Sequence, residues 1–217
     1  MRTTNFGYTS SMFILALMVL GCGASGSTAP KVVDGGAARV HIDELLLADG
    51  QVPKAIKGRM NISRQLVDVR SSTDVTFIGA SAYRIRSWSD KTQGGAPSLS
   101  EVVYEFPQQV EAEEYYSERD VGENFHLADG MAATSLDVES SEFAADDHHV
   151  FCVAYKKRRT VENCEQWGAR MRYKQFVVDL VARQYDANRG YTKIPKHDFL
   201  DFVAAADGHI AQLVGNS

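Results

Sequence analysis

The stretch from His149 to Tyr185 limits the possible folds more than any other part of this 217-residue chain. Apolar side chains alternate with their neighbours along it, first from Phe151 to Tyr155 and again from Trp167 to Leu180. Alternation with a period of two is typical of β-strands that bury one face. A turn around residues 157–159 and a second turn further on therefore predict three antiparallel strands in a meander.

Two cysteines suggest a register for the first of these hairpins. If Lys157-Arg158-Arg159 is the tip, Cys152 and Cys164 lie directly opposite each other on neighbouring strands. Opposed residues in an antiparallel pair have Cβ atoms about 4.5–5.5 Å apart, close to the reach of a disulfide. We therefore predict a Cys152–Cys164 disulfide, which would require an oxidising compartment.

The second turn is predicted at Tyr173-Lys174. It would place three pairs opposite each other on one apolar face: Met171 with Phe176, Ala169 with Val178, and Trp167 with Leu180.

Helices and further strands flank this meander. A short helix is expected over His41–Ala48 and a longer one over Gln108–Arg119, while Ser81–Trp88 and Leu99–Phe106 should pair as a hairpin across the loop Ser89–Ser98. Val67–Val69 and Val75–Ile78 also have the composition of strands. Lys196–Val214 should form an amphipathic helix, with apolar residues three and four apart: Phe199, Phe202, Val203, Ala206, Ile210 and Leu213.

This order of elements predicts the fold class. Residues 40–217 should form a single two-layer α+β domain, in which helices pack on an antiparallel sheet.

The N-terminus has the composition of an export signal. Met12–Leu20 is an unbroken apolar run, preceded by a polar segment whose only charge is Arg2. As a helix, these nine residues would rise about 14 Å, about half the thickness of a hydrocarbon core. A cleaved signal therefore explains the run better than a permanent membrane span.

Val19-Leu20-Gly21-Cys22 resembles the lipobox of bacterial lipoprotein precursors. The resemblance implies that residues 1–21 are a signal peptide cleaved after Gly21 and that the Cys22 sulfur carries a diacylglyceryl group. Residues 22–39 are rich in glycine and small polar residues, which predicts a flexible tether. An ordinary signal peptide ending at Gly23-Ala24 and a short membrane anchor are the alternatives.

Charge excludes one class of partner and suggests another. The net charge of −5 argues against binding to nucleic acid. Glu101–Asp147 carries 14 acidic residues and a single base, a segment that would either steer a charged partner or form a solvated face. Four consecutive cations at the predicted hairpin tip form a candidate patch for a partner or for anionic lipid headgroups, with a solvated turn as the alternative: Lys156, Lys157, Arg158 and Arg159.

No catalytic or metal-binding motif is visible. The chain has no Gly-x-Ser-x-Gly elbow, and the three cysteines are already assigned to lipid and to the disulfide. Asp146-Asp147-His148-His149 offers four potential ligands, but neighbours in a strand point to opposite faces and cannot converge on one ion. We therefore predict no catalytic residue, metal or cofactor. Trp88 is the least core-like of the aromatic residues, and the loop Ser89–Ser98 beside it is where the rim of any pocket is expected.

The order of elements, and segments such as Val103–Tyr115 and Ala169–Leu180, resembles PsbP-like and related extracytoplasmic lipoprotein domains. That resemblance implies an accessory, binding or sensory role. We expect a non-catalytic binding or assembly module in the bacterial cell envelope, held on a membrane by its N-terminal lipid and recognising an envelope protein or small ligand. A cell-envelope hydrolase without a recognisable motif and a structural spacer are the alternatives.

Overall fold

The computed structural model describes residues 40–63, 78–90, 97–118, 130–138, 143–155, 164–183 and 194–215. All of them belong to one unit that runs from Gly36 to Ser217. The predicted signal peptide, residues 1–21, and the predicted tether, residues 22–39, lie outside the described residues.

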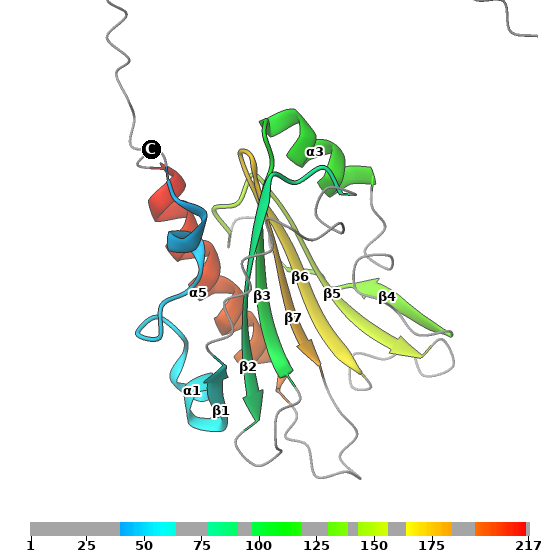
Figure 1. Ribbon diagram of the computed structural model, residues 1–217. Helices are drawn as coiled ribbons and strands as arrows, with labels where there is room; N and C mark the ends of the chain where they lie inside the picture. The colour runs from blue at the N-terminus through cyan, green and yellow to red at the C-terminus, as the bar shows by residue number, and fades with distance from the viewer. Residues whose placement is uncertain are drawn as a thin grey trace, which may run out of the picture. The chain divides into compact units, whose positions relative to one another are not determined.

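One antiparallel sheet of seven strands forms the centre of the described domain (Figure 1). Its order is β1-β2-β3-β7-β6-β5-β4, so that β1 to β3 and β4 to β7 are two sequential blocks joined where β3 pairs with β7. The predicted antiparallel sheet and its C-terminal meander are confirmed. The strands are β1 (Met60–Ser63), β2 (Ala82–Asp90), β3 (Pro97–Glu105), β4 (Met131–Ser135), β5 (Asp147–Tyr155), β6 (Gln166–Tyr173) and β7 (Phe176–Arg183).

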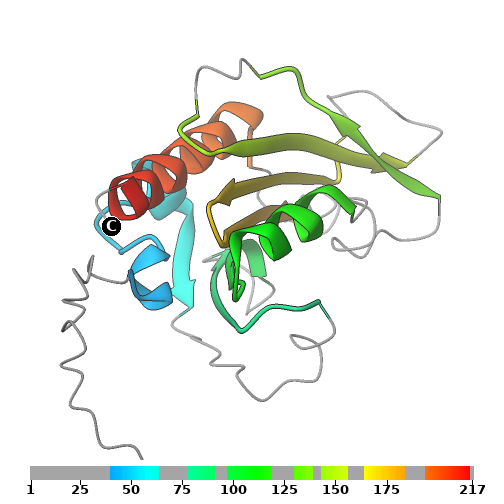
Figure 2. The same ribbon diagram turned by 90° about the horizontal axis from the view of Figure 1, so that it is seen from above.

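Helices cover the two faces of this sheet unequally. On one face, here the α5 face, lie the 3-10 helix η1 (Ile42–Leu45), α1 (Lys54–Arg59) and α5 (Lys196–Gly215), which share the main core with the sheet. On the other, the α3 face, the helix α3 (Gln109–Glu118) contributes to a smaller core. Figure 2 shows α5 and α3 on opposite sides of the central strands. The predicted α+β fold with packed helices is therefore confirmed.

The apolar stripe of α5 packs as its spacing predicted. Phe199, Phe202, Val203, Ala206 and Ile210 are fully buried, whereas Leu213 at the end of the stripe is only partly covered.

The expectation that Trp88 is the least core-like aromatic residue is wrong. Its side chain is 1% exposed, and its ring packs edge-on against Phe202 with centroids 5.4 Å apart. The reason is that Trp88 occurs at a position of β2 that points to the α5 face, where the main core lies.

The β6–β7 turn is one residue later than predicted. Lys174 and Gln175 form it, with Lys174 at a positive φ of 50°, so that Tyr173 faces Phe176. Moving a turn by one residue changes each cross-strand partner by two positions. Met171 therefore pairs with Val178, but the same side chains still share one face, since a shift of two preserves the alternation.

Several short elements differ from the predictions. The expected helix at His41–Ala48 is only the 3-10 turn η1, and α1, β1 and β4 were not predicted because each is too short to show a periodic pattern. Helix α3 was predicted almost to its ends, and its Val110 is 50% exposed. The expected strands Val67–Val69 and Val75–Ile78 lie outside the described residues, except for Ile78 in a turn.

Candidate functional site

A buried ion pair lies beneath α3 on the α3 face. Arg170 of β6 and Asp179 of β7 are direct cross-strand partners, and two parallel hydrogen bonds of 2.8 and 2.9 Å join the guanidinium to the carboxylate. Their side chains are 1% and 6% exposed. Helix α3 covers the pair with Tyr115, whose ring centre lies 5.2 Å from Arg170 Cζ. The bidentate geometry neutralises both buried charges at once.

The ion pair and its burial shift the acid–base behaviour of the groups around it. Burial alone would lower the pKa of Arg170, but the carboxylate of Asp179 outweighs it and the pKa is raised. Burial raises the pKa of Tyr104 well above its ordinary value, and the charge of Asp179 adds to that effect. These groups therefore keep one protonation state across the physiological range, which suits a structural role better than proton transfer.

A second arginine ties α3 to the sheet. Arg172 donates from Nε to Asp147 Oδ2 at 2.7 Å and lies 3.4 Å from Asp146 and 3.3 Å from Glu113 of α3. Asp146 also accepts a hydrogen bond from the backbone N–H of Lys174, in the β6–β7 turn, at 2.7 Å. Part of the acidic segment is thus held by a cation from the meander.

The run Asp146-Asp147-His148-His149 separates only in part, because Asp146 precedes β5 and shares a partner with Asp147. Both aspartates turn to Arg172, the ring of His148 packs against Phe143, and His149 reaches Ser135 of β4. In the part of the chain that the structure describes, no three His, Cys, Asp or Glu side chains gather in a geometry that could hold a metal ion.

Glu101 is a buried charged residue of the α5 face that was not predicted. It is fully buried between Leu99 and Val103, and its Oε2 accepts a hydrogen bond from the backbone N–H of Leu47 at 3.1 Å. Among the described residues its Oε1 has no hydrogen-bond partner. Burial raises the pKa of Glu101 to about 8, although the Leu47 N–H and the charge of Arg86 act in the opposite direction. The sequence did carry a signal for this buried carboxylate, because Glu101 shares its face of β3 with the apolar residues Leu99 and Val103.

A second polar contact on the α5 face joins the sheet to α5. The Tyr173 hydroxyl donates to Asp207 Oδ1 at 2.7 Å, and burial followed by the charge of Asp207 raises the pKa of Tyr173. Asp207 also accepts from the backbone N–H groups of Ala144 and Ala145. This buried carboxylate is a fixed connection between α5, β6 and the segment before β5.

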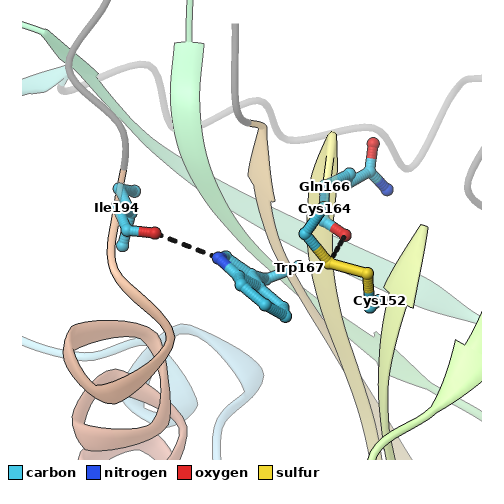
Figure 3. The surroundings of a disulfide bond; sticks show 5 residues. All are labelled: Cys152, Cys164, Gln166, Trp167 and Ile194. Atoms are coloured by element: carbon cyan, nitrogen blue, oxygen red, sulfur yellow. Dashed lines mark hydrogen bonds between the residues drawn. A yellow bond between two sulfur atoms is a disulfide. The ribbon is translucent and has the colours of Figure 1, made fainter. Parts of the chain in front are cut away.

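Cys152 and Cys164 form a disulfide with a Cα–Cα distance of 5.6 Å (Figure 3). The register from which the pairing was predicted is wrong, because Cys152 lies opposite Trp167 in the ladder. Cys164 instead precedes β6, and the bond joins the centre of β5 to that segment. The indole of Trp167 lies beside the disulfide and donates to the backbone oxygen of Ile194 at 3.0 Å, near the start of α5.

The remaining predicted site residues belong to other parts of the chain than those described. Cys22 and the cation patch of Lys156, Lys157, Arg158 and Arg159 lie outside the described residues. Within the described ranges, no helix is long and apolar enough to cross a membrane.

No protein-family model matches this chain, and no curated protein matches it. Among solved structures, the extracellular domain of PknH from Mycobacterium tuberculosis is similar to it, with a TM-score of 0.46 and 15% identity, over 80% of this chain and 98% of that one. A likeness of this size carries no argument about function. The resemblances to lipoprotein precursors and to PsbP-like domains therefore stay predictions.

Proposed function

We propose that this protein is a lipid-anchored extracytoplasmic module that binds or helps to assemble an envelope partner or small ligand. Binding, and not catalysis with turnover, is its role in this proposal. Cys22 carries the lipid, residues 22–39 act as the tether, and the α+β domain presents the recognition surface.

The Cys152–Cys164 disulfide is the observation that supports this location best. Disulfides persist in oxidising compartments outside the bacterial cytoplasm and are rare inside it. This one joins two cysteines that are 3% and 5% exposed in the core of the domain, so it belongs to the folded structure. Together with the lipobox-like segment Val19-Leu20-Gly21-Cys22, it favours export followed by anchoring.

The arrangement of buried charges supports binding over turnover. Arg170 pairs with Asp179, and Arg172 pairs with three carboxylates. In the described part of the α3 face, these two cations therefore contact acidic groups of the domain itself. The cation patch Lys156–Arg159 would then be the recognition element for acidic protein surfaces or lipid headgroups, with about 1 kcal/mol from each cation near a charged membrane.

Lipid anchoring is tested by metabolic labelling with an alkyne-bearing fatty acid in a bacterial host that processes lipoproteins. The full-length chain is expected to carry the label and to sediment with membranes, and Cys22→Ala is expected to lose both properties. Cys152→Ala is the matched control, because it removes a different cysteine and should keep the lipid. A wild-type chain without label would contradict the proposal.

Binding is tested by native mass spectrometry of the full-length protein extracted gently from its membrane. A reproducible companion mass, lost when residues 156–159 are changed to Ser, would support recognition through the cation patch. A lipidated chain that never carries a companion would instead favour the structural spacer.

A further inference from the structure

The contact between Ser135 and His149 has no role in the proposed binding function. Ser135 Oγ and His149 Nε2 are 2.7 Å apart, a hydrogen bond between the last residue of β4 and a residue of β5. Ser135 is exposed, whereas His149 is partly buried. A hydroxyl open to solvent and bonded to an imidazole is the pairing that activates a serine as a nucleophile.

The surroundings of His149 favour the neutral ring that such a pairing needs. Burial lowers the pKa of His149 from 6.5, and the charges of Arg170 and His148 add to the effect. Arg170 is its cross-strand neighbour on β6, Asp147 lies two residues earlier on β5, and β4 contributes no charged residue. The ring also packs against Phe151, with centroids 5.5 Å apart, which restricts its orientation. At neutral pH the imidazole can therefore accept the serine proton.

The backbone N–H of Ser135 is a second group that is placed to take part in a reaction at its hydroxyl. Its neighbour Leu136 donates its N–H to Val150 O at 2.8 Å, and Ser135 lies opposite Phe151 in the β4–β5 ladder. Because hydrogen-bonded and non-hydrogen-bonded pairs alternate along an antiparallel ladder, the N–H of Ser135 points away from β5. β4 is the last strand of the sheet, so this N–H faces the sheet edge, where it can donate to a developing oxyanion.

We propose that Ser135 is a nucleophile that accepts an acyl group from an activated ester, with His149 as its general base. Ser135 Oγ forms a bond to the acyl carbon while its proton moves to His149 Nε2. The bond between the acyl carbon and the leaving oxygen then breaks, and His149 returns the proton to the departing alcohol. The product is a serine ester and a free alcohol, and no other reactant is needed.

The reaction is expected to be slow and stoichiometric. Among the described residues no carboxylate contacts His149, and loss of that orienting group costs a serine hydrolase about 10⁴-fold in rate. Ser135 is therefore a site of covalent modification, which goes beyond the proposed binding function and does not depend on the lipid anchor.

The test uses the purified full-length chain with p-nitrophenyl acetate, followed by peptide mapping. We expect one acetyl group on Ser135, and a rate that rises as His149 loses its proton and reaches a plateau near neutral pH. Ser135→Ala should abolish this adduct, and His149→Gln should slow it by at least about 100-fold.

Two matched variants separate this mechanism from general surface reactivity. His197→Gln changes an exposed histidine of α5 that lies 3.0 Å from Asp198, and Ser100→Ala changes a serine of β3, on a strand four places from β4 in the sheet. Both should keep the wild-type rate. The proposal is overturned if Ser135 is not acetylated, if His149→Gln reacts as fast as wild type, or if the wild-type rate climbs with hydroxide without a plateau. The plateau is measured on the wild type, so it decides the matter even if a variant fails to fold.

Discussion

Gly168 shows how one residue can decide the packing of two strands. It lies opposite Phe151 in the β5–β6 ladder, and the phenyl ring occupies the space above its backbone. A Cβ built on Gly168 would lie 2.1 Å from Phe151 Cζ. Because Phe151 is fully buried, its ring has no free space to move into, and glycine is required here for close approach and not for an unusual φ.

We predict that Gly168→Ala destabilises the domain by about 3 kcal/mol, since overpacking a filled core forces side chains and backbone to shift. Chemical denaturation followed by tryptophan fluorescence measures the change. Gly208→Ala on α5 is the control: nothing lies within 4 Å of its Cβ position, so it should be neutral or stabilising by up to about 1 kcal/mol. Equal effects of the two substitutions would refute the steric explanation.

At the scale of elements, the disulfide holds β5 to the segment that leads into β6. Cys152 lies at the centre of β5 and Cys164 is 12 residues later, before the first residue of β6. The bond therefore limits the freedom of the connection between the two strands, and its neighbour Trp167 extends the contact to the start of α5.

Removing this crosslink should lower the free energy of unfolding by about 3 kcal/mol. Without the bond, the unfolded chain gains conformational entropy of about that size for a loop of this length. The double variant Cys152→Ala, Cys164→Ala is expected to lose this stability in denaturant titrations. Wild type treated with dithiothreitol should lose a similar amount, while the double variant should not respond to it. Free thiols at both positions in the unreduced, denatured protein would show that the bond does not form.

At the scale of the whole molecule, Glu101 couples stability to pH. Its pKa is about 8 in the fold against 4.5 for an ordinary glutamate, so the folded state binds the proton more tightly than the unfolded chain. The stability that this group contributes is fully present below pH 4.5 and is lost as the pH rises towards 8. Above that range, the domain must bury an ionised carboxylate or unfold.

Glu101→Gln should remove this dependence, because its amide oxygen can still accept the Leu47 N–H and it carries no charge. Between about pH 4 and about pH 9, we expect the free energy of unfolding of the variant to improve relative to wild type by on the order of 4 kcal/mol. Denaturant titrations at several pH values measure this difference. Glu105→Gln on the same strand should follow the wild-type curve, and parallel curves for Glu101→Gln and wild type would contradict the prediction.

The candidate site was less predictable than the fold. The Cys152–Cys164 pairing was predicted correctly, although from a register that is wrong. The Ser135–His149 contact was not predicted, because β4 is a short strand of small residues with no periodic signal. The salt bridge between Arg170 and Asp179 depends on a register that the local pattern leaves open: both residues stand in apolar runs, and only the position of the β6–β7 turn makes them partners.

Local patterns by themselves determined the strands of the meander, the β2–β3 hairpin, α3 and the buried stripe of α5, because periods of two and of three to four residues depend only on which face of an element is covered. Tertiary structure decided what those patterns do not encode. The pairing of β3 with β7 joins two blocks of strands that are distant in the chain. The observed register of β5 and β6 places Cys152 opposite Trp167. Packing on the α5 face buries Trp88 and Glu101. These outcomes depend on turn geometry and on contacts between segments that are remote in the sequence. Such contacts contribute to stability only once the sheet has formed.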